Sequence, residues 1–174
     1  MLRVATLEDA PGIARVHVES WKTTYAGLMP ESILANLSLE KRTQNMERFL
    51  RSQPEHAVTI VTEEDGCIVG FAQCGLNRDL EMDPAFAGEL YGIYLLKEWQ
   101  HQGLGKQLVK TASRFLLSHA LKSMIVWALA SNQPACRFYA ALGGSSIRER
   151  EIEIQGQRML ETSYGWNDLR RLAS

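Results

Sequence analysis

The sequence lacks an excess of charge of either sign and a long apolar run. Lys plus Arg number 19 and Asp plus Glu number 20, which gives a net charge of -1. A basic surface that would attract phosphate backbones is therefore not expected, and we predict no nucleic-acid partner. No stretch reaches about 18 uncharged apolar residues, and residues 1–10 contain acids without an apolar signal segment. The sequence predicts a cytoplasmic protein with no membrane span or signal peptide.

Cysteine is also scarce, with three residues at Cys67, Cys74 and Cys136. They form no CxxC pair, and no histidine lies near them at metal-ligand spacing. Their odd number favours reduced thiols over a disulfide framework or a structural zinc site. The four histidines, which form no cluster, are His17, His56, His101 and His119. We therefore expect no bound metal.

The length and composition are those of one ordinary globular domain. The chain has 174 residues, of which 45% are hydrophobic and 22% charged. That length favours one domain over residues 1–174, and these fractions are close to the globular average. Because no repeat, linker or low-complexity run interrupts the chain, we expect a single hydrophobic core.

The first half of the chain alternates between helix and strand signals. Residues 2–5 can form a short strand, and Thr6 can cap a helix that has Pro11 in its first turn. A second helix, capped by Ser38, is predicted to run to about Arg51. Residues 58–62 and 67–74 are β-branched runs joined through Asp65-Gly66, which predicts a hairpin.

The second half repeats strand and helix before a final pair of strands. Residues 90–96 are apolar almost throughout, so we expect a strand buried on both faces. A helix follows, with apolar positions on one face at Leu104, Leu108, Val109, Ala112, Phe115 and Leu116. A strand over 124–130, a helix over 134–142 and strands over 147–154 and 158–164 complete the order. The predicted fold is α/β, a mixed sheet with helices on both faces.

The segment between the strand at 90–96 and its helix carries the strongest chemical signal. It reads Gln100-His-Gln-Gly-Leu-Gly105, with two glycines just before the helix. Glycines let a ligand approach the backbone, and the unpaired first amides of a helix suit a phosphate or diphosphate. A P-loop needs Ser or Thr after Lys106, and a Rossmann loop needs glycine at Leu108. Both are excluded, which leaves another diphosphate loop or a bare turn.

This loop resembles the [Q/R]-x-x-G-x-[G/A] loop of the GNAT N-acetyltransferase superfamily. A second segment, Asn132-Gln-Pro-Ala-Cys-Arg-Phe-Tyr-Ala-Ala-Leu-Gly143, is similar to that family's N-x-x-A-x-x-[F/L]-Y-x-x-x-G pattern. Together with similarity upstream, around Trp21 and Tyr25, the resemblance spans nearly the whole chain. It implies a GNAT fold, a mostly antiparallel sheet with a splayed parallel strand pair that forms the acetyl-CoA cleft.

The resemblance implies a set of residues that bind acetyl-CoA as cosubstrate. Backbone groups of a strand would pair with the pantetheine arm, and loop amides would hold the diphosphate. Asn132 would hold the cofactor arm, although a helix cap is a compatible alternative. The implied cofactor residues are Ile93, Tyr94, Leu95, Gln100, His101, Gln102, Gly103, Leu104, Gly105, Lys106 and Asn132.

The resemblance also implies an acid and a base for acetyl transfer to an amine. Tyr139 stands at the family's tyrosine position and would donate a proton to the leaving thiolate, whereas simple core packing is the alternative. Glu89 stands where some family members carry a basic glutamate, but it can also be a solvated strand-end charge. Many members use a water chain instead. The ribosomal-protein branch places its base glutamate where this chain has Trp127.

The acceptor is the least determined part of the sequence. Trp21 and Tyr25 are the predicted acceptor-binding residues, and Tyr91, Tyr94 and Trp127 are further aromatic candidates. Three acids could attract a cationic amine, namely Glu31, Glu81 and Asp83. The resemblance to bacterial small-molecule members favours a small primary amine attacked directly in a ternary complex. The alternatives are a protein or peptide N-terminus or lysine, and a non-catalytic acyl-CoA sensor. A homodimer is compatible, because dimers are common in the family.

Overall fold

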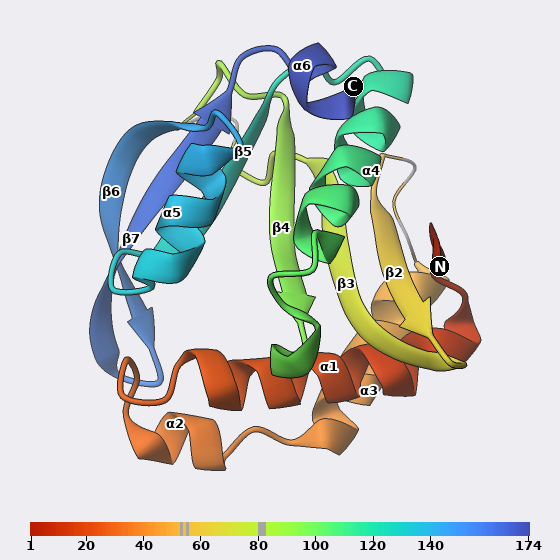
Figure 1. The fold of residues 1–174 in the computed structure, drawn as a ribbon. Coiled ribbons are helices and arrows are strands. Elements are labelled where there is room, and N and C mark those ends of the chain that lie inside the picture. The colour runs from red at the N-terminus through yellow and green to blue at the C-terminus, as the bar shows by residue number, and fades with distance from the viewer. Residues whose placement is uncertain (53, 55, 80–82) are drawn as a thin grey trace.

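A seven-stranded sheet forms the centre of the computed structural model, which describes residues 1–52, 54, 56–79 and 83–174 (Figure 1). The strand order is β1-β2-β3-β4-β5-β7-β6. Every neighbouring pair is antiparallel except β4 and β5, which are parallel. The strands are β1 (Leu2–Val4), β2 (Val58–Glu64), β3 (Cys67–Leu76), β4 (Gly88–Leu95), β5 (Met124–Leu129), β6 (Ser145–Ile154) and β7 (Gln157–Trp166). The predicted mixed, mostly antiparallel sheet is confirmed.

Helices cover both faces of this sheet, as predicted. One face packs against α4 through Leu108, Val109 and Leu116. The other packs against α1 through Ile13 and Val16, and α3 lies beside α1 (Figure 1). The helices are α1 (Ala10–Thr24), α2 (Glu31–Ala35), α3 (Leu39–Arg51), α4 (Leu104–Ser118), α5 (Gln133–Ala141) and α6 (Arg170–Ala173). Among the described residues, each helix is too short or too polar to span a bilayer.

Local sequence signals account for most of these boundaries. Thr6 forms a capping box with Asp9 before α1, and the Ser38 hydroxyl accepts the Lys41 amide at the start of α3. Asp65 and Gly66 have φ values of 50° and 78° in the β2–β3 turn, as a hairpin of the expected type requires. The short helices α2 and α6 were not predicted, because four or five residues show too little periodicity.

A bulge in β4 produces the feature that positions the site. Gln73 pairs with Gly92 and Cys74 pairs with Leu90, so Tyr91 is an extra residue in β4. The pairing of β4 with β5 reaches Leu90 and Val126 and goes no further among the described residues. Beyond that point the two parallel strands separate, which gives the splayed pair that the resemblance implied. The backbone edge of the second half of β4 is left without a strand partner there.

The prediction that residues 90–96 are buried on both faces was wrong for most of the segment. Leu90 is 1% exposed and Leu96 is 5% exposed, but residues 91–95 are only half-buried. These five residues lie where β4 leaves β5, so one side of the strand faces a cleft and not the core. An apolar strand at a ligand cleft and a strand inside a core have the same composition, which explains the error.

Candidate active site

Two cavities open beside the second half of β4. The first, which we call the β4–β5 cleft, has a volume of about 310 Å³. Its walls come from residues 91–95 of β4, the loop and first turn of α4, β5, the start of α5, and the end of α1 with Tyr25. The second, the α1–α3 cavity, has a volume of about 340 Å³ and is walled by α1, α3, β3 and β4. Tyr91 and Tyr94 line both cavities.

The loop before α4 presents backbone amides to the β4–β5 cleft. Gly103 is the N-cap of α4, has a φ of 83° and supplies no side-chain cap to the first amides of the helix. A Cβ at Gly105 would lie 3.3 Å from the Phe138 ring, so glycine allows α4 to approach α5 closely. The Gln100 side chain donates to the Leu95 carbonyl at 3.1 Å, which ties the loop to the end of β4. Such a helix start can bind a phosphate or diphosphate.

Most of the predicted cofactor residues are brought together at this cleft. Gln102 and Leu104 are the exceptions among them. The Gln102 side chain donates to the Glu98 carbonyl at 2.8 Å, and the Leu104 side chain packs against the core beside α1. The predicted residues that line the cleft are Ile93, Tyr94, Leu95, Gln100, His101, Gly103, Gly105, Lys106 and Asn132.

Asn132 has two structural contacts at the start of α5. Its side-chain oxygen accepts the Ala135 amide at 3.3 Å, so it caps the helix. Burial raises the pKa of Tyr25, and a hydrogen bond with the Asn132 side chain counteracts part of that rise. Asn132 is 5% exposed and lines the β4–β5 cleft. The capping alternative is therefore present in the structure, and it leaves the residue in the cleft wall.

Tyr139 differs from Tyr91 and Tyr25 in how its hydroxyl is engaged. The Tyr91 hydroxyl donates to the Leu76 carbonyl at 2.8 Å, and Tyr25 interacts with Asn132. The Tyr139 hydroxyl has no hydrogen-bond partner among the described residues, although its ring is buried and lines the cleft. Burial, reinforced by the Tyr94 and Tyr25 hydroxyls, raises the pKa of Tyr139 above its ordinary value. The group is protonated at neutral pH and can act as a proton donor.

Glu89 is fully engaged by an arginine. Its Oε2 accepts hydrogen bonds from the Arg78 backbone amide and Nε, both at 3.0 Å, and its Oε1 pairs with Arg78 Nη2 at 2.5 Å. The Glu89 side chain is 5% exposed, whereas that of Arg78 is 63% exposed. Glu89 lines neither cavity. These contacts do not favour the base role that the resemblance implied, which stays a prediction.

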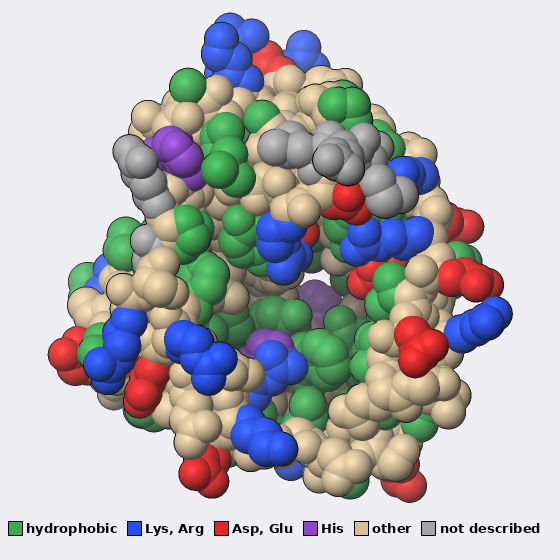
Figure 2. All heavy atoms as spheres, turned by 180° about the vertical axis from the view of Figure 1, so that it is seen from behind, with side chains coloured by type: hydrophobic (Ala, Val, Ile, Leu, Met, Phe, Trp, Pro, Cys, Tyr) green, Lys and Arg blue, Asp and Glu red, His purple; other side chains and the backbone are tan. Residues whose placement is uncertain are grey.

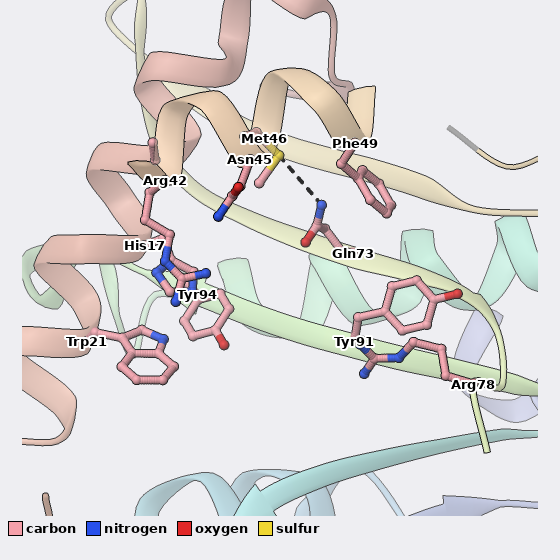
Figure 3. Close-up of a pocket in the computed structure, with 11 residues that line it drawn as sticks. His17, Trp21, Arg42, Asn45, Met46, Phe49, Gln73, Arg78, Tyr91 and Tyr94 are labelled. Carbon is pink, nitrogen blue, oxygen red and sulfur yellow. Dashed lines mark hydrogen bonds between the residues drawn. The ribbon is translucent and has the colours of Figure 1, made fainter. Parts of the chain in front are cut away.

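The α1–α3 cavity is aromatic on one side and carries arginines at its ends (Figure 3). The His17 ring stacks on Trp21 at a centroid distance of 5.2 Å and lies 4.8 Å from Tyr94. Arg42 lies over Trp21, and Arg78 lies over Tyr91. The face turned to the viewer in Figure 2 is hollowed, with hydrophobic and histidine side chains inside and several Lys or Arg side chains at the rim.

The predicted acceptor residues are divided between the two cavities. Trp21 lines the α1–α3 cavity, and Tyr25 lines the β4–β5 cleft. Two of the three acids considered for attracting a cationic amine lie away from both cavities. Glu31 lines neither cavity, and Asp83 is buried in an ion pair with Arg148 at 2.8 Å. Glu81 lies outside the described residues.

Sequence reasoning missed the polar residues of the α1–α3 cavity. They are Arg42, Asn45, Gln73 and Arg78. Arg42 and Asn45 belong to α3, whose many charged residues suggest a solvent-exposed helix. They line the cavity because α3 packs beside α1. A lone arginine after a β-strand, such as Arg78, carries no motif either. The sequence offered no signal by which to find them.

A statistical model of the acetyltransferase (GNAT) family matches residues 19–143, well over half of the chain. The chain belongs to the GNAT acetyltransferase family. This GNAT chain is thus an acyltransferase, and the predicted family is confirmed. It is 39% identical over 171 residues to an uncharacterized N-acetyltransferase of Bacillus subtilis, YuaI, covering 98% of this chain and 95% of that protein. A spermidine N(1)-acetyltransferase of Thermoplasma acidophilum is 25% identical over 141 residues, which cover 79% of this chain and 83% of that protein.

Solved structures show the same GNAT fold at low sequence identity. The PaiA N-acetyltransferase of Thermoplasma acidophilum, determined with coenzyme A, superposes with a TM-score of 0.72 at 22% identity, over 93% of this chain and 96% of that chain. A ribosomal-protein-alanine N-acetyltransferase of Brucella melitensis gives 0.73 at 20% identity, over 95% and 98%. At these identities the likeness shows the fold alone. The predicted fold class is confirmed.

Proposed function

We propose that this chain transfers the acetyl group of acetyl-CoA to the primary amine of a small molecule, within one ternary complex. The observation that carries this proposal is the junction of the two cavities at Tyr91 and Tyr94. One cavity has the backbone amides that suit a diphosphate, and the other has the aromatic and polar walls typical of a small-ligand site. Two substrates bound on either side would meet at this junction.

The residues of the β4–β5 cleft fit acetyl-CoA. The free backbone edge at Ile93, Tyr94 and Leu95 can pair with the amides of the pantetheine arm, because the parallel pairing stops at Leu90. The amides that follow Gly103 lack a side-chain cap and can receive the diphosphate. A GNAT structural neighbour, PaiA, was determined with coenzyme A. Acetyl-CoA would supply an activated acetyl thioester in this cleft.

A side chain of the cleft can take part in the proton transfers of the reaction. Transfer forms a C–N bond and breaks a C–S bond, so the amine must lose a proton and the sulfur must gain one. We assign the donation to sulfur to Tyr139, whose hydroxyl is protonated and unpartnered among the described residues. The proton lost by the amine passes to solvent water. Glu89, held by Arg78, remains a candidate base that the pH profile of its variant can test.

The size of the acceptor side supports a small molecule. A cavity of about 340 Å³ falls within the range of small-ligand sites, and its lining residues come from two helices and two strands, with a residue shortly after one of the strands. A peptide would need a groove that continues beyond these walls. Peptide amines and an acyl-CoA sensor without turnover are kept as outcomes of the test.

The test is a coenzyme A release assay with the purified chain, run beside calorimetry with acetyl-CoA. The acceptor panel contains polyamines, amino acids, amino phosphates, aminoglycosides and short peptides. Binding of acetyl-CoA together with release in a small-amine pool supports the proposal. Release with peptides alone would assign the peptide alternative, binding without release would assign the sensor, and no binding would overturn the proposal.

A further inference from the structure

The charges that face the α1–α3 cavity are all positive among its described lining residues. Arg42 and Arg78 line it, and no aspartate or glutamate of the described part of the chain does. Asn45 and Gln73 add uncharged polar groups, and the Gln73 amide is already engaged with Thr59 at 3.0 Å. Acidic residues would be expected around a polyamine, because a buried cation requires a counter-charge. The described lining residues of the cavity therefore lack the counter-charge that such a substrate would need.

The two arginines differ in how far their charge is already neutralised. Arg78 uses Nε and Nη2 to bind Glu89, so this pair adds little net charge to the cavity. Arg42 makes no ion pair among the described residues. It is half-buried on α3, with its guanidinium 5.7 Å from the centre of the Trp21 ring. Among the described lining residues, Arg42 is therefore the cation whose charge is left for a ligand to pair with.

The surroundings of Arg42 direct its charge into the cavity. Figure 3 shows Arg42 beside His17 and Trp21, while Arg78 lies with Tyr91 toward the other end. Burial and the nearby Arg42 charge lower the pKa of His17 to about 3, so its ring is neutral at physiological pH. The His17 Nδ1 is buried without a hydrogen-bond partner among the described residues. The aromatic wall thus supplies contact area but no competing ion for Arg42.

We propose that the acceptor amine carries a compact anionic group, a carboxylate or a phosphate, which binds Arg42. This inference rests on the proposed function and names its substrate class. A guanidinium matches the geometry of either anion and can bind it through two parallel hydrogen bonds. With the anion at Arg42, the body of the acceptor lies along Trp21 and Tyr94, and its amine reaches the junction with the β4–β5 cleft. Arg42 is then a specificity-determining residue, not a catalytic one.

The test compares matched acceptors in the coenzyme A release assay. Each amino carboxylate is assayed beside its carboxamide, each amino phosphate beside the corresponding amino alcohol, and both series beside spermidine. The chain is expected to prefer the anionic member of a pair, and the series with the larger preference identifies the anion. For Arg42→Gln we expect KM for the anionic acceptor to rise roughly 10- to 100-fold, as for loss of a charged hydrogen bond. Its KM for the neutral partner should rise far less, because that partner carries no anion for Arg42 to bind, and the ratio of the two KM values is the readout.

Arg48→Gln is the matched control, because it removes the same charge from an exposed position on the same helix and lies outside both cavities. It should leave both KM values unchanged. A preference for the neutral member of each pair, or for spermidine over the anionic acceptors, would overturn this inference and leave the proposed function standing. An equal effect of Arg42→Gln on both members of a pair would also overturn it. No turnover with any acceptor would overturn the proposed function, and this inference with it.

Discussion

The two cavities that meet at Tyr91 and Tyr94 are built from different parts of the chain. The β4–β5 cleft is walled mainly by three continuous stretches, within residues 91–95, 100–106 and 127–139. The α1–α3 cavity collects single residues from α1, α3, β3 and β4, between Ala14 and Tyr94. The first offers backbone groups at a free strand edge and at an uncapped helix start, beside the side chains that line it. The second presents side chains.

This difference indicates which half can change its ligand. A site made from backbone amides depends on glycines and on strand pairing, so most side-chain changes leave it intact. A site made from side chains on two helices changes with each substitution. We infer that the cleft determines the acyl donor of this chain, whereas the α1–α3 cavity selects its acceptor. The following predictions test that division, from the largest expected effect to the smallest.

The largest effect is expected from Tyr139→Phe. Removing the hydroxyl should lower kcat about 100-fold, as for loss of a general acid, and leave the Kd of acetyl-CoA unchanged. The coenzyme A release assay measures kcat, and calorimetry measures the Kd of acetyl-CoA. The control is Tyr164→Phe, whose ring centre lies 6.0 Å from that of Tyr139 and which does not line the cleft. Equal losses in both variants would remove Tyr139 from the chemistry.

The Arg78–Glu89 pair should respond asymmetrically to mutation. Arg78→Met leaves a buried carboxylate without its partner and should lower the free energy of unfolding by about 2 kcal/mol, less than for a fully buried pair. Glu89→Gln leaves an arginine that water can solvate, so its cost should be about 1 kcal/mol. Urea unfolding measures both.

The same Glu89→Gln variant also tests the base role. If water takes the amine proton, the pH profile of kcat/KM keeps its shape. Loss of the acidic limb of that profile in Glu89→Gln, with normal acetyl-CoA binding, would instead establish Glu89 as the base.

Gly103→Ala tests the loop before α4, and Gly66→Ala in the β2–β3 turn is its matched control. Both glycines have a positive φ, 83° and 78°, and a Cβ added at either position would meet open space. Each substitution should therefore lower the free energy of unfolding by about 1 kcal/mol through backbone strain. Only Gly103→Ala should also weaken acetyl-CoA binding, about tenfold, because it displaces the first amides of α4. Equal affinities in the two variants would place the diphosphate elsewhere.

The smallest effect concerns His17 and acid stability. Burial lowers its pKa to about 3 in the folded chain, against about 6.5 in an unfolded chain. The unfolded state binds more protons between these values, so stability is complete above about pH 6.5 and falls as the pH decreases. The expected loss is about 1 kcal/mol between about pH 6.5 and about pH 5.5. Urea midpoints should lose this part of their pH dependence in His17→Gln, and an unaltered slope would contradict the assignment.

The sequence contained enough information for the sheet, the main helices and the glycine turn before α4. Asp65-Gly66, Ser38 and Gly103 each act through local backbone chemistry, so their effect can be read without knowing the rest of the fold. The bulge at Tyr91 could not be predicted, because it depends on the register between β3 and β4. Arg42 could not be assigned to a cavity, since its direction depends on how α3 packs beside α1.

The most direct test of the central claim is a crystal structure of the chain with acetyl-CoA. The account predicts the pantetheine arm along the free edge of β4 at Ile93–Leu95, the diphosphate at the amides after Gly103, and the thioester sulfur beside the Tyr139 hydroxyl. It also predicts that the α1–α3 cavity stays free of the cofactor. A thioester away from Tyr139, or a cofactor that fills the α1–α3 cavity, would contradict it.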